Sequence, residues 1–182
     1  MSNTVPEQIS GSVLSAENIL LAIENGDLSV SPFEKDNIHG ASLDLRLGKE
    51  FRIYKEPENI VSVKEDADYK KITDKIVLDD KNKYYDLKPQ TSCLGVTKES
   101  LKLSNKICAF LSGRSRFARI GLFIHFSSNF IQPGIEGPVV LEIFNSSNHT
   151  LRLFPDVCVC QVIFLETKGE AAYNGQFQKQ IL

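Results

Sequence analysis

The chain has 182 residues, of which 42% are hydrophobic and 24% charged, and its formal net charge at pH 7 is −2. A net charge this small excludes a global field that attracts nucleic acid or an anionic membrane, so a polyanionic ligand would need a local cluster of cations. No apolar run approaches the length of about 18 residues expected of a transmembrane helix, and the first residues lack the pattern of a signal peptide. We therefore expect a cytoplasmic protein of one domain, with neither nucleic acid nor membrane as a partner.

The cysteines and histidines do not form a metal-binding pattern. Cys93, Cys108, Cys158 and Cys160 include no C-x-x-C pair, and no histidine lies at metal-ligand spacing from them. In a cytosolic chain such cysteines are expected to be reduced residues of the core. We therefore expect no zinc site.

The N-terminal region predicts one short helix. Residues 1–12 are polar and indicate a loosely held extension. Ser15 is a favoured N-cap residue and predicts the start of a helix, and Gly26 suits the left-handed position that follows a helix. The apolar face of this helix consists of Ile19, Leu20 and Ile23.

From residue 28 the pattern changes to a period of two, which is typical of half-buried strands. Residues 43–47 alternate strictly, so Asp44 and Arg46 lie on the face opposite the leucines. That placement fits either a solvated face or a cross-strand ion pair, and the residues alone leave both open. Residues 55–83 are dense in mixed charge and predict an exposed insertion with one short apolar run at 76–78. Because these charges balance, the insertion does not resemble a basic nucleic-acid tail.

The second half of the chain predicts further strands at 101–103, 107–111, 120–126, 139–144, 151–154 and 157–165. Residues 107–111 form a continuous apolar run, which indicates a strand buried on both faces. Pro133 and Gly134 mark a turn. Many short strands with one helix predict a mainly β fold, a barrel or sandwich of jelly-roll type.

Glu142 is a lone carboxylate within an apolar run. On a strand it shares one face with Val140 and Phe144, and both faces are otherwise apolar. A carboxylate there is either paired or lines a cavity, since an isolated buried charge is unfavourable. A general base with a raised pKa and a structural glutamate paired with an arginine remain equally open at this point.

A second unusual stretch crowds Arg114, Arg116 and Arg119 into six positions after Gly113. In an extended segment the first two side chains would point the same way, whereas a turn after Gly113 would present backbone N–H groups to an anion. Arginine suits forked hydrogen bonds with phosphate oxygens. An exposed basic turn without function is the alternative, and we favour a phosphate-binding cluster.

Four motifs occur in the order and with the spacing seen in dCTP deaminases, a family of the dUTPase-like superfamily. They are ASLDLRLG at 41–48, SGRSRFARIGL at 112–122, IQPGIEG at 131–137 and VLEIFN at 140–145. The chain resembles this family from about residue 13 to its C-terminus, so residues 13–182 are interpreted as one dCTP deaminase-like domain. The resemblance implies a distorted, jelly-roll-like β-barrel with a short N-terminal helix, assembled as a homotrimer with active sites between subunits.

The resemblance also implies an activity, the hydrolytic deamination of dCTP to dUTP and ammonia without zinc, which feeds pyrimidine deoxynucleotide synthesis. Zinc-dependent nucleobase deaminases carry H-x-E followed by P-C-x-x-C, and neither half occurs here. Glu142 matches the catalytic glutamate that takes a proton from the water attacking C4 of cytosine. Ser115 and Arg119 match the groups that position the water and the base, and Ser128 matches the position whose backbone carbonyl helps to hold that water.

Other positions match the nucleotide-binding residues of the family. The segment after Gly113 would grip the nucleotide, residues 140 and 141 would lie beside the pyrimidine, and the tail would close over a triphosphate that carries Mg²⁺. The substrate-binding positions implied in this way are Arg114, Ser115, Arg116, Phe117, Ala118, Arg119, Gln132, Val140, Leu141, Glu142, Tyr173, Gln176 and Gln180.

Some positions depart from the family pattern. Gln132 stands where the family usually has an aspartate that contacts the sugar 3′-hydroxyl. Its amide oxygen can still accept that hydrogen bond, but it cannot serve as a carboxylate base. Arg116 replaces a small residue, and Gln176 replaces a lysine. His125 matches a histidine that the family links to inhibition by dTTP, so dTTP is a possible inhibitor.

The resemblance leaves two further hypotheses. One is a dUTP diphosphatase or a bifunctional deaminase and diphosphatase, against which Gln132 and the absence of a glycine-rich C-terminal motif count. The other is a non-catalytic nucleotide-binding homologue, against which the presence of Ser115, Arg119 and Glu142 counts. We expect a dCTP deaminase.

Overall fold

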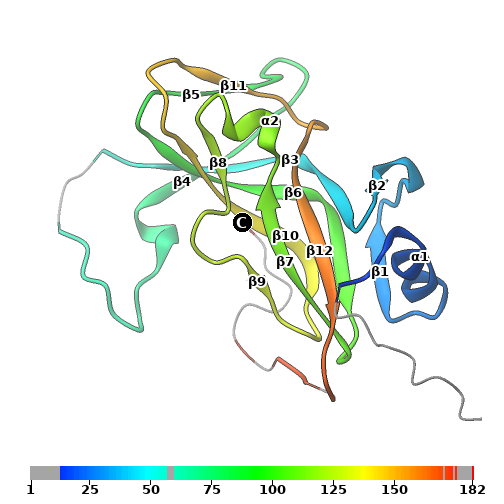
Figure 1. Ribbon diagram of the computed structural model, residues 1–182. Helices are drawn as coiled ribbons and strands as arrows, with labels where there is room; N and C mark the ends of the chain where they lie inside the picture. The colour runs from blue at the N-terminus through cyan, green and yellow to red at the C-terminus, as the bar shows by residue number, and fades with distance from the viewer. Residues whose placement is uncertain (1–12, 57–59, 170, 174, 176–181) are drawn as a thin grey trace, which may run out of the picture.

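The computed structural model describes residues 13–56, 60–169, 171–173, 175 and 182 (Figure 1). A curled antiparallel sheet of ten strands dominates it, in the order β8-β10-β6-β3-β12-β7-β9, with β1 paired to β6 and both β2 and β4 paired to β3. The strands of this sheet are β1 (Leu28–Ser31), β2 (Ile38–His39), β3 (Ser42–Tyr54), β4 (Thr73–Val77), β6 (Ser92–Leu103), β7 (Ile107–Gly113), β8 (Leu122–Ile124), β9 (Phe130–Ile131), β10 (Glu136–Asn145) and β12 (Cys158–Glu166). The prediction of a mainly β, barrel-like fold is confirmed.

The remaining elements are short. A two-stranded sheet pairs β5 (Tyr85–Leu87) with β11 (Leu151–Leu153) at one end of the molecule. The helices are α1 (Ala16–Glu24) and α2 (Ser115–Ala118), with the 3-10 turns η1 (Lys35–Asn37) and η2 (Tyr69–Lys71). No helix within the described ranges has the length and hydropathy needed to cross a membrane.

Helix α1 forms as its sequence predicts. The Ser15 side chain accepts a hydrogen bond from the backbone N–H of Asn18, and Gly26 has a φ of 78° just after the helix. Ile19 is fully buried and joins the main core. In Figure 1 the helix lies beside β1 at the edge of the sheet, on the side opposite the residues that follow β3. The helix therefore closes one edge of the core.

The concave side of the curled sheet holds the core. Leu45, Leu47, Phe51, Leu141 and Phe164 are each completely buried there. Alternation along the strands sends every second side chain to this side. One prediction is wrong: within the expected buried run at 107–111, Phe110 is 45% exposed and packs against Phe130 at a ring distance of 5.2 Å. A β-strand turns successive side chains to opposite faces, so an apolar run does not ensure burial on both.

The charged insertion is shorter than the sequence suggests. Its last part forms β4, which pairs with β3 so that Tyr54 lies opposite Thr73. Leu78 is buried, whereas Ile60 and Val63 are almost fully exposed. The prediction of an exposed, irregular insertion therefore holds for residues before β4 and is wrong for β4 itself.

Asp44 and Arg46 are buried, so the interpretation of a solvated face is wrong. Arg46 donates from Nε to Glu99 Oε1 at 2.6 Å, and Arg114 Nη2 lies 3.0 Å from Asp44 Oδ2. Burial lowers the pKa of Arg46, but its hydrogen bonds to Glu99 and Glu34 outweigh that effect and raise it. The ion-pair interpretation holds, because each buried charge has a partner from another strand or loop.

Candidate active site

Strand β10 presents Glu142 on the face of the sheet opposite the core. Leu141 and Ile143, its neighbours in sequence, are fully buried on the core face. Glu142 pairs with Leu94 of β6, so apolar strands flank it. Its side chain keeps 30% of its surface exposed. The alternation read from the sequence therefore places this carboxylate at a surface that a ligand can reach.

The Glu142 side chain lines a groove with a volume of about 1040 Å³. This volume lies just above the usual range for small-molecule sites. Five of the residues predicted for the site line it: Ser128, Gln132, Val140, Glu142 and Tyr173. Residues 65–70 of the insertion and Tyr54 also line it. The groove thus brings together residues from both halves of the chain.

His125 is the immediate neighbour of Glu142. Its backbone N–H donates to the Glu142 carbonyl oxygen at 2.6 Å, and its Nδ1 lies 3.4 Å from Glu142 Oε2. Both of these side-chain atoms are buried and have no hydrogen-bond partner among the described residues. Buried polar atoms are rarely left unpaired, so a water or a ligand is the natural partner here. Since no described arginine pairs with Glu142, the structure favours the cavity interpretation over the structural pair.

Tyr54 is a residue of the groove that the sequence alone did not reveal. It lies on β3, two positions after Arg52, and Arg52 pairs with Leu94, the partner of Glu142. Burial raises the pKa of Tyr54, and the negative charge of Glu142 raises it further. The hydroxyl group is therefore a neutral donor at physiological pH. Strand alternation could have placed Tyr54 on this face, but no motif marked it.

The arginine-rich segment is a helical turn, which is one of the two conformations that the sequence left open. Phe117 N donates to the carbonyl of Arg114 at 2.9 Å, and Arg119 N donates to that of Ser115 at 3.1 Å. These local bonds form α2 and turn successive side chains away from one another. Ser115, Arg116, Ala118 and Arg119 are exposed, whereas Phe117 packs partly against the core. The turn after Gly113 agrees with the alternative that the sequence left open.

The structure does not bring this turn into the groove of its own chain. None of the described residues that line the groove comes from positions 114–119. Arg114 instead contacts Asp44 and donates from Nη1 to the Cys158 carbonyl at 3.3 Å. Gln176 and Gln180, predicted for the triphosphate, lie outside the described residues. One chain therefore carries two separate parts of the predicted site.

No metal or thiol chemistry is evident in the described part of the chain. No group of three or more His, Cys, Asp or Glu side chains is placed there to hold a metal ion. All four cysteines are free. Burial raises the pKa of Cys93 to about 12 and also raises that of Cys160. These two thiols are protonated at neutral pH and are poor nucleophiles.

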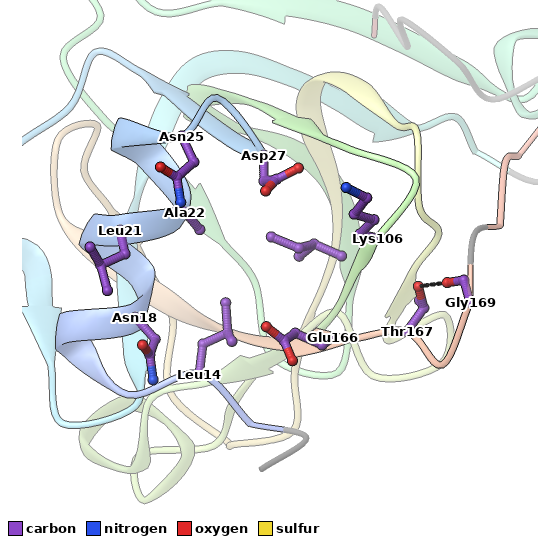
Figure 2. A pocket seen from close by; sticks show the side chains of 11 residues that line it. Leu14, Asn18, Leu21, Ala22, Asn25, Asp27, Lys106, Glu166, Thr167 and Gly169 are labelled. Atoms are coloured by element: carbon purple, nitrogen blue, oxygen red, sulfur yellow. Dashed lines mark hydrogen bonds between the residues drawn. The ribbon is translucent and has the colours of Figure 1, made fainter. Parts of the chain in front are cut away.

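A second hollow of about 480 Å³ lies between α1 and the ends of β7 and β12 (Figure 2). Leu14 and Leu21 approach it from one side, and Lys106 and Glu166 from the other. No residue predicted for the site lines it. The groove at Glu142 is therefore the candidate site.

A curled β-barrel with a half-buried carboxylate in a groove, whose Oε2 accepts no hydrogen bond within the described residues, fits an enzyme active site. The sequence model of the dCTP deaminase-like family matches residues 13–167. The chain belongs to the dCTP deaminase-like family.

Curated relatives extend this match over most of the chain. A protein of Aquifex aeolicus (strain VF5) named "dCTP deaminase, dUMP-forming" is 34% identical over 170 residues, covering 92% of this chain and 90% of the relative. A protein of Buchnera aphidicola subsp. Baizongia pistaciae (strain Bp) named "dCTP deaminase" is 39% identical over 170 residues, 88% of each chain. Both cover enough sequence to support membership of the family.

A solved structure agrees in fold. The 2′-deoxycytidine 5′-triphosphate deaminase from Agrobacterium tumefaciens superposes with a TM-score of 0.66 at 20% identity, over 86% of this chain and 48% of the other. This chain thus spans about half the length of that protein. At this level of identity the likeness concerns the fold alone.

Proposed function

We propose that the chain is a dCTP deaminase that converts dCTP and water to dUTP and ammonia. One observation carries this proposal: Glu142, which the resemblance matches to the family's catalytic glutamate, lines the groove, and its Oε2 has no hydrogen-bond partner among the described residues. The names of the relatives from Aquifex and Buchnera support the substrate. The cavity is large enough for a nucleotide.

The proposed chemistry needs one residue that moves protons. Glu142 takes a proton from water as the water oxygen bonds to C4 of cytosine, while the C4=N3 double bond opens and N3 receives that proton. Glu142 then moves the proton of the new C4 hydroxyl to the exocyclic nitrogen, and the C4–N bond breaks with release of ammonia and formation of the C4 carbonyl. A positioned carboxylate typically contributes about 10²–10⁴-fold to such a step. Ser128 lines the groove and is proposed to help hold the water through its carbonyl group.

We further propose that a neighbouring copy completes each site in a homotrimer. The exposed residues Ser115 and Arg119 lie outside the groove of their own chain, which fits a role at another copy's groove. A head-to-tail ring places one surface of each copy against a different surface of the next. Phe110, Phe123 and Phe126 are 45–52% exposed, and a set of exposed aromatic rings is typical of an interface.

The triphosphate would enter as its Mg²⁺ complex, with the ion as part of the substrate. Tyr173 lines the groove and is proposed to cover the phosphates. Because dTTP carries the same triphosphate, it is proposed to bind the same groove as an inhibitor. His125, beside Glu142, is the residue that would meet its base.

Gln132 favours dUTP, rather than dUMP, as the product. It lines the groove, where its amide can accept a hydrogen bond from the sugar but cannot act as a base for attack on the phosphates. The curated relatives carry both names, with and without dUMP formation. The residue in this chain therefore favours deamination without release of pyrophosphate.

One assay tests these assignments. The purified chain is incubated with dCTP and Mg²⁺, and ammonia and pyrophosphate are measured together. One ammonia per dCTP without pyrophosphate is the expected result. Equal amounts of both products would replace the proposal with a bifunctional enzyme. Retained binding of dCTP with neither product would show a non-catalytic protein.

A further inference from the structure

Asp44 is a buried carboxylate for which the proposed chemistry has no direct use. It lies in the middle of β3 with 3% of its surface exposed. A carboxylate is this deeply buried in a stable protein only when its charge is compensated. The identity of its partners therefore indicates what the residue does.

Its nearest partner is the first residue of the arginine-rich segment, and His39 Nε2 lies farther away, 3.4 Å from Asp44 Oδ2. Arg114 Nη2 lies 3.0 Å from Asp44 Oδ2, while Arg114 Nη1 donates to the carbonyl of Cys158 at 3.3 Å. One contact comes from β3 and the other from β12, which are neighbours in the sheet. Two nitrogens of one guanidinium group are thus fixed to the wall of the barrel.

Arg114 also begins α2 through its backbone. Its carbonyl oxygen accepts hydrogen bonds from Phe117 N at 2.9 Å and Ala118 N at 3.0 Å. The helical turn that carries Ser115 and Arg119 is therefore joined to the barrel at the residue that Asp44 holds. Displacement of the Arg114 side chain would release a restraint on this turn.

The Arg114 side chain is restrained without being enclosed. It keeps 33% of its surface exposed, and a guanidinium group has five N–H donors. Donors remain available on the exposed side after the contacts with Asp44 and Cys158. An arginine that is already ordered loses less side-chain entropy when it binds an anion than a free one does.

We propose that Asp44 is a positioning residue for the nucleotide's phosphates, acting through the Arg114 guanidinium that it holds against the barrel. The proposal rests on the proposed function, since it assigns Arg114 to the phosphates of dCTP. This role differs from that of a purely structural ion pair, whose loss would affect folding without affecting the affinity for phosphates.

The same strand offers a matched control. Arg46 lies two positions after Asp44 on the same face, and it donates to the buried carboxylate of Glu99 at 2.6 Å. Glu99→Gln removes a buried negative charge, as Asp44→Asn does, but its ion pair does not involve Arg114. Comparison of the two variants separates loss of a buried ion pair from loss of Arg114 positioning.

The test measures the dissociation constants of dCTP and of deoxycytidine, which lacks phosphates, together with kcat and KM. Asp44→Asn is expected to weaken dCTP binding and raise KM about tenfold or more, the effect of one lost charged hydrogen bond, with a smaller change in kcat. Deoxycytidine binding should stay within about twofold, as should dCTP binding to Glu99→Gln. In an Arg114→Gln background, Asp44→Asn should have no further effect on dCTP affinity, because coupled residues are not additive.

Three results would overturn the proposal: equal losses of dCTP affinity in Asp44→Asn and Glu99→Gln, equal losses for dCTP and deoxycytidine, or a full effect of Asp44→Asn in the Arg114→Gln background. If Asp44→Asn does not fold, Arg114→Lys provides the test. Lysine keeps the charge but lacks the fork, so unchanged dCTP affinity in that variant would also contradict positioning. A wild-type chain that binds dCTP without releasing ammonia would refute the proposed function and leave the affinity comparison intact.

Discussion

The backbone N–H of His125 donates to the carbonyl oxygen of Glu142 at 2.6 Å, while His125 Nδ1 and Glu142 Oε2 lie 3.4 Å apart with no hydrogen-bond partner in the described structure. The backbone contact fixes the two residues side by side. His125 has a φ of 54°, a conformation that residues other than glycine adopt rarely and often at functional sites. The pair is thus held in place with two polar atoms left for a ligand or a water.

The first prediction concerns this carboxylate. Glu142→Gln keeps the size of the side chain and removes the base, so turnover of dCTP should fall by at least ~10²-fold. Binding of dCTP, measured by calorimetry, should change little. Glu50→Gln is the control, because Glu50 is a surface residue paired with Lys75 and does not line the groove. Near-normal turnover in Glu142→Gln would refute the assigned role.

The second prediction tests whether sites are shared between copies. Arg119→Ala and Glu142→Gln should each be inactive alone. If each site takes Glu142 from one copy and Arg119 from the next, trimers assembled from equal amounts of both variants should recover about a quarter of wild-type activity, since random assembly leaves that share of sites intact. Co-expression followed by the ammonia assay measures this recovery. A mixture as inactive as its components would show that both residues serve the same copy.

The third prediction compares two glycines with positive φ. Gly26 has a φ of 78° and free space around it, so Gly26→Ala should cost only the conformational penalty of about 1–2 kcal/mol. Gly121 has a φ of 87°, and an added Cβ would lie 2.8 Å from Ser147 Cβ and 2.9 Å from its backbone nitrogen. The overlap should add about 1–3 kcal/mol in Gly121→Ala. Equal unfolding free energies in urea would contradict this packing.

The fourth prediction concerns stability in acid. Arg152 donates to both oxygens of Asp86 at 2.8 and 2.9 Å, and these bonds hold the pKa of Asp86 below its ordinary value of 3.8. A lowered pKa in the folded state stabilises fully above the unfolded value, and the contribution disappears as the pH falls through the folded value. The Tm difference between wild type and Asp86→Asn should therefore be larger at about pH 7 than at about pH 3. A difference that stays constant or grows on acidification would refute this contribution.

The sequence predicted the helix and most of the strands because their patterns are local. Ser15 and Gly26 mark the ends of α1, and alternation at 43–47 assigns the leucines of β3 to the core. The burial of Asp44 and Arg46 on the other face of β3 could not be predicted, because it depends on their partners Arg114 and Glu99, which are distant in sequence. The exposure of Phe110 was missed for a similar reason, because what covers a strand is a property of the fold.

The candidate site also has some features that local sequence patterns predict and others that depend on the fold. Strand alternation was sufficient to place Glu142 opposite Leu141 and Ile143. It left a cavity and a structural ion pair equally open, and the groove in the structure favours the cavity. The contribution of residues 65–70 to the groove had no signal in the sequence, because charged insertions are usually only solvated. For Tyr54 the only signal was strand alternation, since no motif marked it. The helical turn at Ser115–Ala118 was one of two open interpretations, and local hydrogen bonds decided between them.

Residues 65–70 form one wall of the groove and determine how its shape can change during evolution. The segment leaves the sheet at Tyr54 and returns at Thr73, and these residues are direct partners across β3 and β4. Its length can therefore change without shifting the register of the barrel, and doubling a flexible loop costs only about 0.6 kcal/mol in closure entropy. Substitutions and insertions there can reshape one side of the groove while the core and Glu142 stay in place. Ligand preference can thus evolve separately from folding stability.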